Sequence, residues 1–396
     1  MKKFKDKSWH LPEVDPAKHI VVLAGEHSGD MHSAKLISEL KTLNPELTFS
    51  GLGGEMMVAQ GMTLLGDRTD HVAMGIVGLA SVIRHHAKLL FGVVRMIQRM
   101  RPAAVILVDS PDFNLRVASR IHALGIPVYY YITPQIWAWR RGRIKQIKKF
   151  IDVAYCLFDF EKELFDEAGI DTEWIGHPLV EIIANRQARD LRADLGLAPD
   201  KKLIGLLPGS RKSEIRYLAP ALAGAAEIIR RKRDDTEFVF SRAPGIPADF
   251  LAQFMGETNF RVIENRSQDI MAASDAIIVA SGTATLEASL LDVPMVVAYK
   301  TSLLCYCVLI RMLKIKNFSL TNIVARRRVV PEMMQGYCNP EAISKEVLRL
   351  LEGDNLARMR EDLAEVRQHL GEPGAAARAA ASMLKRLGLT PKTLES

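Results

Sequence analysis

Two short motifs in the second half of the chain combine glycine, hydroxyl groups and charge in the way that an anion site requires. Pro-Gly-Ser-Arg at residues 208–211 and Ser-Gly-Thr-Ala-Thr-Leu-Glu at residues 281–287 each follow an apolar run. Glycine lets a phosphate approach the backbone, and the first amides of a helix carry partial positive charge. A diphosphate would fit both motifs, with Arg211 facing it and Glu287 accepting hydrogen bonds from a ribose diol. Each motif by itself is also compatible with an ordinary capped turn between a strand and a helix.

A carboxylate at the end of an apolar run is the candidate for acid–base chemistry in the first half. Asp109 and Asp112 flank a Ser-Pro pair directly after the apolar residues 104–108. A carboxylate that emerges there into a cleft can take the proton of an alcohol acceptor. An aspartate just before a helix can instead cap its first turn. We assign Asp109 to general-base chemistry and Asp112 to capping.

The loop after the first apolar run contains two glycines but lacks the Gly-x-Gly-x-x-Gly pattern of dinucleotide-binding folds. A nicotinamide or flavin cofactor is therefore disfavoured. Glu26 and Ser28 remain as hydrogen-bonding groups for a sugar or phosphate that lies against Gly29. His177, in a Gly-His-Pro sequence, has two interpretations that the residues leave open: a sugar contact and a structural hydrogen bond.

An aromatic and basic stretch lies between these motifs. Trp137 and Trp139 are followed by Arg140, Arg141, Arg143, Lys145, Lys148 and Lys149. Single-stranded nucleic acid can stack and pair on such a surface. Arginines beside a sugar cleft serve anionic small substrates equally well. Because no RNA-binding signature accompanies the stretch, nucleic acid is the second choice of partner.

Short apolar runs alternate with segments of helical period along the whole chain, which predicts parallel sheets covered by helices. We expect strands at residues 19–24, 47–52, 104–109, 127–131, 153–157 and 173–175. A second series is expected at 203–207, 237–240, 261–263, 276–280 and 295–299. The charged stretch 181–202 is the expected linker, so the predicted domains are 1–190 and 191–396, with helices from 340 onward. Loops beyond the carboxyl ends of the strands would converge on one cleft between the domains.

The composition excludes several classes of protein. The chain has 396 residues, of which 48% are hydrophobic and 25% charged, so collagenous and disordered classes do not fit. Its longest apolar run, residues 303–310, is too short to span a bilayer. The four cysteines have no metal-binding spacing, and neither a metal nor a cofactor is expected. The basic start lacks an apolar signal segment, which predicts a cytoplasmic protein, and the net charge of +7 predicts anionic partners.

One apolar helix has two interpretations. Its apolar face comprises Ile76, Ala80, Ile83, Ala87, Leu90, Val94 and Ile97, while Arg84 and Lys88 lie elsewhere. Such a helix normally faces a core, but its basic flanks would also suit a membrane surface. The apolar residues 303–313, with Arg311, Lys314 and Lys316, raise the same question.

Eight motifs in order resemble those of the lipid-A-disaccharide synthase family, over about residues 20 to 340. They are Gly25-Glu-His-Ser-Gly-Asp30, Gly51-Leu-Gly-Gly54, Met74-Gly-Ile-Val77, Asp109-Ser-Pro-Asp-Phe-Asn114, Trp137-Ala-Trp-Arg140, Gly176-His-Pro178, Leu207-Pro-Gly-Ser-Arg211 and Ala280-Ser-Gly-Thr-Ala-Thr-Leu-Glu287. The resemblance implies an α/β protein of GT-B type, with two Rossmann-like domains. It also implies a peripheral protein of the inner membrane.

The implied activity is an inverting glycosyl transfer. UDP-2,3-diacylglucosamine would react with the 6-hydroxyl of 2,3-diacylglucosamine 1-phosphate to give the β-1,6-linked lipid A disaccharide 1-phosphate and UDP. The resemblance makes Asp109 the base. The implied acceptor residues are Glu26, Ser28, Gly29, Asn114, Arg140 and His177. The implied UDP-binding residues are Gly209, Ser210, Arg211, Ser281, Gly282, Thr283, Glu287 and Asn322.

The chain departs from the family pattern near Asn322. Thr321 stands where the family often has proline, and Arg326–Arg328 stand where a glycine and an acid are common. Two other classes of protein remain open alternatives, a UDP-sugar epimerase of similar fold and an RNA-binding protein. Association into a homodimer also remains open.

Overall fold

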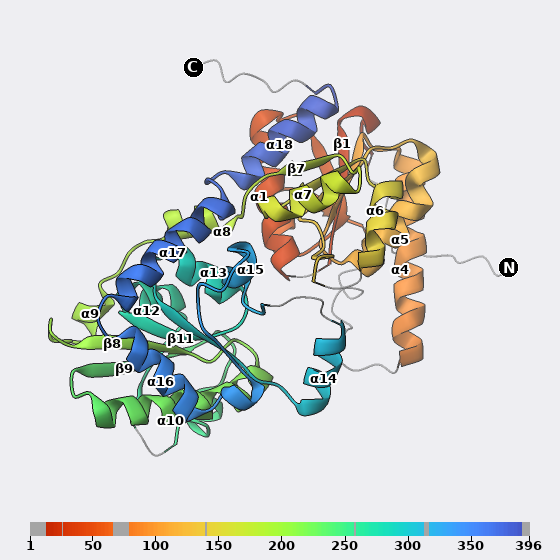
Figure 1. The fold of residues 1–396 in the computed structure, drawn as a ribbon. Coiled ribbons are helices and arrows are strands. Elements are labelled where there is room, and N and C mark those ends of the chain that lie inside the picture. The colour runs from red at the N-terminus through yellow and green to blue at the C-terminus, as the bar shows by residue number, and fades with distance from the viewer. Residues whose placement is uncertain are drawn as a thin grey trace, which may run out of the picture. The chain divides into compact units, whose positions relative to one another are not determined.

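The computed structural model describes residues 13–25, 27–65, 79–138, 141–256, 259–312 and 317–389. They form two compact units (Figure 1), one made of Met1–Pro178 and Pro373–Ser396 and the other of Leu179–Glu372. Each unit is built on its own parallel sheet. The chain therefore changes unit after Pro178, whereas the sequence predicted a boundary at residue 190.

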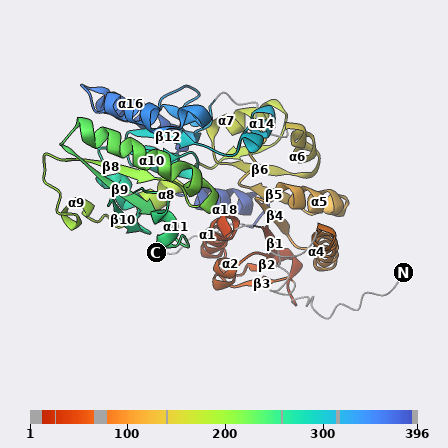
Figure 2. The same ribbon diagram turned by 90° about the horizontal axis from the view of Figure 1, so that it is seen from below.

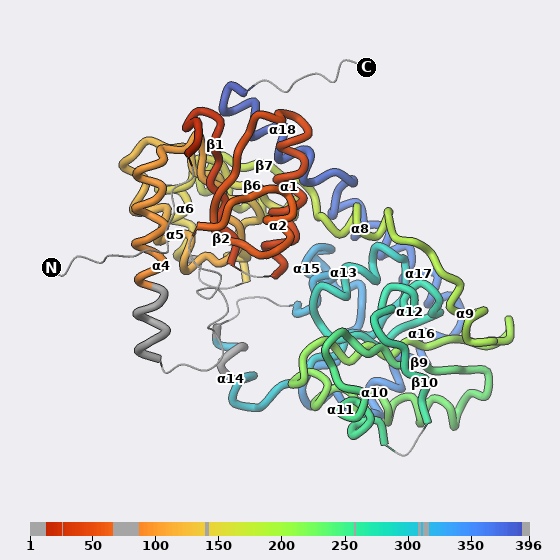
Figure 3. Tube along the Cα trace, turned by 180° about the vertical axis from the view of Figure 1, so that it is seen from behind, coloured from red at the N-terminus to blue at the C-terminus, as the bar shows by residue number. Residues whose placement is uncertain are grey.

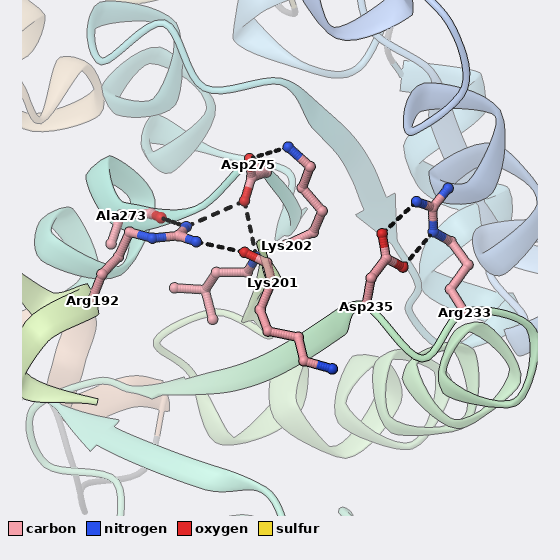
Figure 4. Close-up of polar contacts among 8 residues, drawn as sticks. Arg192, Lys201, Lys202, Arg233, Asp235, Ala273 and Asp275 are labelled. Atoms are coloured by element: carbon pink, nitrogen blue, oxygen red, sulfur yellow. Dashed lines mark hydrogen bonds and ion pairs between the residues drawn. The ribbon is translucent and has the colours of Figure 1, made fainter. Parts of the chain in front are cut away.

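Polar contacts explain this earlier change of unit. Helices α8 (Leu179–Ala184) and α9 (Leu191–Asp194) belong to the second unit. Arg192 of α9 donates to the carbonyl of Ala273 at 3.0 Å and to the carboxylate of Asp275 at 3.2 Å (Figure 4). The same carboxylate accepts the backbone N–H of Leu203 at 2.9 Å. The expected linker is thus bound to the second sheet through the partly buried pair of Arg192 and Asp275.

The first sheet has seven parallel strands in the order β3-β2-β1-β4-β5-β6-β7. They are β1 (His19–Ala24), β2 (Thr48–Leu52), β3 (Met62–Leu64), β4 (Ala104–Val108), β5 (Val128–Tyr131), β6 (Val153–Cys156) and β7 (Thr172–Trp174). Strands β1, β4, β5 and β6 are buried along their whole length, as expected for a sheet covered on both faces. Only the short edge strand β3 was not predicted.

Helices cover both faces of the first sheet (Figure 2). The helices are α1 (His27–Leu43), α2 (Glu55–Ala59), α4 (Leu79–Met100), α5 (Pro111–Ile121), α6 (Ile144–Phe150) and α7 (Asp159–Glu167). One core cluster joins α4, α5 and α6 to the sheet. In α4, Leu90, Val94 and Ile97 lie in this cluster, so the described part of that apolar face is core. Ile76 and the side chains of Ala80 and Ile83 lie outside the described residues.

The second sheet has six parallel strands in the order β10-β9-β8-β11-β12-β13. They are β8 (Lys202–Leu207), β9 (Thr236–Arg242), β10 (Arg261–Glu264), β11 (Ala276–Ala280), β12 (Met295–Tyr299) and β13 (Glu332–Met334). Its other helices are α10 (Lys212–Lys232), α11 (Ala248–Ala252), α12 (Ser267–Ala273), α13 (Thr283–Leu290), α14 (Leu303–Met312), α15 (Leu320–Val324), α16 (Pro340–Leu350) and α17 (Asn355–Leu370). Strand β13 was not predicted.

The last helix, α18 (Ala375–Arg386), returns to the first unit and packs along α1. Its apolar face, including Met383 and Leu384, is buried in the second core cluster of that unit. Arg378 donates to the carbonyl of Ile175 at 2.7 Å, and Ser382 lies 3.1 Å from the hydroxyl of Tyr155. A division at residue 190 would place this helix with the second unit. The burial of an alanine-rich face explains why it does not stay there.

No described helix combines the length and the apolar character needed to cross a bilayer.

Truncation of Leu384 tests the return of α18 to the first unit. Leu384→Ala removes a fully buried side chain and should lower the free energy of unfolding of that unit by about 2 to 5 kcal/mol. All four tryptophans precede Pro178, so tryptophan fluorescence during urea unfolding follows the first unit. Exposed Lys385→Ala is the matched control. Equal unfolding midpoints for both variants would contradict the packing.

Candidate active site

A pocket of about 380 Å³ opens at the carboxyl ends of β8, β9 and β11 in the second unit. It gathers both anion motifs of the sequence. Its lining includes every predicted UDP-binding residue except Asn322, namely Gly209, Ser210, Arg211, Ser281, Gly282, Thr283 and Glu287. Two separate stretches of sequence thus meet at one edge of a parallel sheet, as the topology requires.

Gly282 sets the direction in which α13 begins. It has φ +155° and ψ −159°, a conformation open essentially to glycine alone, and a Cβ atom there would have no heavy atom within 4 Å. Its carbonyl accepts the hydroxyl of Thr285 at 2.8 Å. The following amides, at Thr283 and Ala284, belong to the first helical turn and lack intrahelical acceptors. They therefore carry partial positive charge at the pocket wall.

The loop at Gly209 is held by a carboxylate. Glu214 accepts the backbone N–H groups of Ser210 at 3.0 Å and of Arg211 at 3.2 Å, and it also binds the Arg211 guanidinium at 3.0 Å. Gly209 has φ +104°, and a Cβ atom there would lie 2.3 Å from the Glu214 carboxylate. The backbone amides that were predicted to bind a ligand anion therefore donate to the carboxylate of Glu214. The Arg211 side chain remains largely exposed.

Glu287 lies at the pocket wall on α13, partly buried. Its carboxylate accepts the Nε2 group of Gln268 at 3.0 Å. Burial raises the pKa of the Glu287 carboxyl, and the hydrogen bond from Gln268 opposes that effect. A half-buried acceptor with one donor already in place is suited to binding hydroxyl groups.

Sequence reasoning missed the part of the wall that comes from β9 and β10. Ser241, Arg242, Asn265 and Ser267 also line the pocket. Arg242 is oriented by the carbonyl of Ile246 at 2.7 Å and by a close ion pair with Glu264. Their position was the available signal. Ser241 and Arg242 end β9, and Asn265 and Ser267 follow β10, so all four lie at the carboxyl ends of strands.

Asn322 does not line the pocket. Its side chain is fully buried, donates to the carbonyl of Val330 at 2.9 Å and to Glu332 at 2.8 Å, and accepts the N–H of Val329 at 2.8 Å. These bonds join α15 to the segment that leads into β13. Thr321, which replaces the common proline, donates its hydroxyl to the carbonyl of Thr285 at 3.0 Å. Thr321 thus joins α15 to α13, whereas Asn322 joins α15 to the segment before β13.

In the first unit, Asp109 occupies a strained turn at the end of β4. Asp109 and Ser110 both have left-handed backbones, with φ of 54° and 42°. The carbonyl of Asp109 accepts the amide of Asn114 at 2.7 Å and the hydroxyl of Tyr130 at 2.7 Å. Asn114 is buried below the turn and so acts on Asp109 through the backbone. The Asp109 residue itself remains partly exposed.

The assignment of Asp112 to capping is wrong. Ser110 occupies the position before α5, where it makes no side-chain cap, and Pro111 is the first helical residue. Asp112 lies in the first turn and pairs with Arg143 at 2.5 Å. Proline at the first position needs no hydrogen bond for its nitrogen, so the helix begins without a carboxylate cap.

The first turn of α1 lies beside Asp109. A Cβ atom at Gly29 would lie 3.8 Å from the Cβ atom of Asp109, and one at Gly25 would lie 1.9 Å from the hydroxyl of Ser110. Gly25 therefore permits the close approach of its loop to Ser110, whereas a side chain at Gly29 would make only ordinary contacts. Ser28 is exposed between them. Two predicted site residues, Glu26 and Arg140, lie outside the described residues.

His177 is buried against Phe158, with ring centroids 5.4 Å apart. Burial, and secondarily the nearby His32, lowers the pKa of His177 to about 3. Asp109 is one of the charges that act on His32. His177 is therefore a neutral ring near the Asp109 loop. Whether it contacts a sugar stays a prediction.

Trp137 does not offer a free stacking plane. Its ring is buried, and its Nε1 group donates to the buried carboxyl of Glu161 at 2.8 Å. Burial raises the pKa of Glu161 to about 7 against the opposing effect of its hydrogen bonds. Trp139 lies outside the described residues. Of the two tryptophans proposed to stack on nucleic acid, Trp137 therefore has no exposed ring face for that role.

Within the described ranges, no three His, Cys, Asp or Glu side chains group as metal ligands.

Comparison with known proteins identifies the family. The family model for lipid-A-disaccharide synthetase matches residues 20–385. The chain belongs to this family. It is 43% identical over 372 residues to the lipid-A-disaccharide synthase of Myxococcus xanthus, which covers 93% of this chain and 97% of that one. It is 36% identical over 385 residues to that of Geobacter metallireducens, covering 94% and 98%. The resemblance predicted from the motifs is confirmed.

Solved structures agree on the fold of this synthase family member. The UDP-GlcNAc 2-epimerase of Neisseria meningitidis, bound to UDP-GlcNAc, aligns with TM-score 0.63 at 12% identity, covering 93% of this chain and all of that one. The calicheamicin glycosyltransferase CalG4 aligns with TM-score 0.59 at 14% identity, covering 93% and 98%. The predicted GT-B class, with two parallel sheets and helices, is confirmed. The epimerase alternative rests on this distant likeness of fold alone.

The burial of His177 predicts a pH dependence of stability. The folded ring stays neutral down to about pH 3, whereas an unfolded histidine binds a proton below about pH 6.5. Its contribution is therefore present above pH 6.5 and is lost as the pH falls. Between about pH 6.5 and 5, the loss in the free energy of unfolding from this protonation should amount to about 2 kcal/mol. The free energy of unfolding, measured by urea unfolding with tryptophan fluorescence, should fall by about 2 kcal/mol less in His177→Gln than in wild type over this range. Equal falls in the two proteins would contradict the assignment.

Proposed function

We propose that the two units divide the reaction of the family between them. The second unit binds the UDP of UDP-2,3-diacylglucosamine, and the first presents 2,3-diacylglucosamine 1-phosphate to Asp109. Membership of the family makes the chain a glycosyltransferase that forms the lipid A disaccharide. One observation carries the division of labour: the pocket of the second unit collects both anion motifs at the N-terminus of α13.

The pocket provides the groups that a departing diphosphate needs. The first-turn amides after Gly282 point their partial positive charge at it, and the exposed Arg211 guanidinium adds a full charge. In our proposal the diphosphate takes over Arg211 from Glu214, while Glu214 keeps the backbone of the Gly209 loop in shape. Glu287 accepts the ribose hydroxyls, helped by Gln268. Ser241, Arg242, Asn265 and Ser267 complete the wall on the nucleoside side.

Asp109 acts as the general base on the acceptor. Its carboxylate takes the proton from the 6-hydroxyl while that oxygen forms a bond to the anomeric carbon. The bond between the anomeric carbon and the diphosphate oxygen breaks, and UDP leaves from the opposite face with inversion. The strained turn at Asp109, secured below by Asn114 and Tyr130, supports this role because strain of this kind is maintained where a side chain must be aimed.

The remaining predicted residues surround this base. Ser28 and Gly29 provide a hydroxyl and an open backbone for the acceptor sugar, next to the neutral ring of His177. Glu26 and Arg140 are proposed to bind the acceptor and its phosphate. Transfer requires the proposed donor site of the second unit and the proposed base of the first to act on the same pair of substrates. Because both substrates carry acyl chains, we also propose that the chain works as a peripheral protein on the cytoplasmic face of the inner membrane.

The direct test is to incubate the protein with both acylated glucosamine substrates and to analyse the products by mass. The proposal expects a disaccharide 1-phosphate and one UDP for each disaccharide. An epimerase would instead alter the sugar nucleotide when it is supplied alone. Conversion of the single nucleotide without any disaccharide would contradict the proposal.

Asp109→Asn separates the base from substrate binding. The amide keeps the size of the side chain but cannot take the acceptor proton, so the transfer rate should fall roughly 10²- to 10⁴-fold. The affinity for UDP, measured by calorimetry, should not change. Asp112→Asn is the matched control, because this exposed carboxylate pairs with Arg143 and has no proposed role in transfer. A large loss of UDP affinity in Asp109→Asn would indicate a structural role instead.

Gly282→Ala tests the start of α13 as the diphosphate site. The methyl group meets no atom, but the required backbone costs about 1 to 3 kcal/mol for alanine, so the turn should change direction. UDP should bind roughly ten- to a hundredfold more weakly by calorimetry. Gly256→Ala is the control, because that glycine also has positive φ (74°) and open space but does not line the pocket. Equal UDP affinity in the two variants would remove α13 from the site.

A further inference from the structure

The helix α14 exposes large apolar side chains. Leu303 and Leu304 are 76% and 77% exposed, and Ile310 is 46% exposed. Other exposed apolar residues of the second unit, such as Val262, are isolated. Single exposed leucines are common, but several on one short helix indicate a contact surface.

No other described helix or strand packs closely along α14. Figures 1 and 3 draw it on the outside of the second unit, away from the helices that cover the sheet. It follows β12, which pairs with β11 in parallel. The chain therefore enters α14 from the same edge of the sheet at which the donor pocket opens. The apolar surface and the pocket share one side of the unit.

The charge of this segment has one sign. Between Asp292 and Glu332 the sequence has no acidic residue but contains seven basic ones: Lys300, Arg311, Lys314, Lys316, Arg326, Arg327 and Arg328. Some already have partners, since Arg327 pairs with Asp362 and Glu365. Arg311 is exposed on α14 itself. An apolar helix that carries an exposed arginine, within a stretch of sequence that is rich in cations and has no carboxylate, complements anionic lipid headgroups.

We propose that α14 docks the second unit onto the surface of an anionic bilayer. Leu303, Leu304 and Ile310 enter the boundary between headgroups and acyl chains, and Arg311 pairs with lipid phosphate. Ten residues of helix span about 15 Å, so α14 lies in the interface and does not cross it. This surface is distinct from the apolar helix of the first unit. It rests on the proposed function in one respect, because an acylated donor must be drawn from a membrane.

The double variant Leu303→Ser/Leu304→Ser tests the apolar contact in the full-length protein. Its partition onto vesicles of phosphatidylcholine and phosphatidylglycerol, measured by cosedimentation, should fall about tenfold or more. Tyr337→Ser is the matched control, because Tyr337 is 75% exposed in the same unit but lies outside α14. Unchanged UDP affinity in both variants shows that the unit remains folded. Equal vesicle binding by the two variants would overturn the proposal.

Arg311→Glu tests the charge. Loss of one cation near an anionic surface should weaken binding roughly fivefold, and reversal should weaken it further. The effect should disappear on vesicles of phosphatidylcholine alone. An equal effect on both kinds of vesicle would contradict a contact with anionic headgroups.

The native cysteines allow a direct measurement of insertion. Cys305 and Cys307 are exposed on α14, whereas Cys156 and Cys338 are buried, so a thiol-reactive dye labels this helix in the native protein. Its emission should shift to the blue when anionic vesicles are added, and brominated lipids should quench it. A dye that remains in water while the protein binds vesicles would overturn the proposal.

Activity in detergent separates this inference from the proposed function. If both hold, the double variant forms disaccharide normally from detergent-dispersed substrates but poorly from vesicles. Wild type that binds vesicles through α14 but forms no disaccharide in detergent would contradict only the function.

A double variant that loses transfer in detergent while binding vesicles normally would assign α14 to the substrate acyl chains. Loss of a dimer by light scattering, with vesicle binding intact, would assign α14 to a second copy. Both of these last results would overturn docking.

Discussion

The candidate site depends on how the chain leaves the carboxyl ends of two parallel strands. At β11 the exit runs through Gly282, whose backbone conformation suits glycine alone, and the first amides of α13 become the pocket wall. At β4 the exit runs through Asp109 and Ser110, both left-handed. A relaxed turn at either place would direct the amides or the carboxylate elsewhere. Buried hydrogen bonds from Asn114 and Tyr130 to the Asp109 carbonyl offset the strain at the second exit.

Electrostatics prepares the pocket of the second unit before any ligand enters. Glu214 holds the Gly209 loop by accepting two backbone N–H groups and the Arg211 guanidinium. In our proposal, a bound diphosphate competes with Glu214 for the Arg211 guanidinium, while Glu214 keeps the backbone of the loop in shape. The amides of α13 have no such internal acceptor within their helix. The two motifs that look equivalent in sequence therefore differ in structure, because the amides of the first already have an internal acceptor and those of the second have none within their helix.

Several polar residues that look functional in sequence support the site from below. Asn322 joins α15 to the segment before β13, and Asn114 secures the turn that aims Asp109. Trp137 donates to buried Glu161, which removes its ring from any surface. In each case the side chain satisfies buried polar groups that would otherwise lack partners. Substitution of these residues would act on the site through its backbone, in contrast to substitution of Asp109, which would remove the proposed base.

Local pattern in the sequence was enough to predict the strands that carry the site, because buried parallel strands appear as unbroken apolar runs that end in glycine, proline or aspartate. It also identified the two motifs that meet at the pocket, although each by itself was compatible with an ordinary capped turn. The edge strands β3 and β13, of three residues each, were missed, whereas β7, which is equally short, was predicted. Only the tertiary structure decided that α18 returns to the first unit and that Asn322 is buried. Those outcomes depend on contacts between residues far apart in sequence or on which face is buried, and no local pattern encodes them.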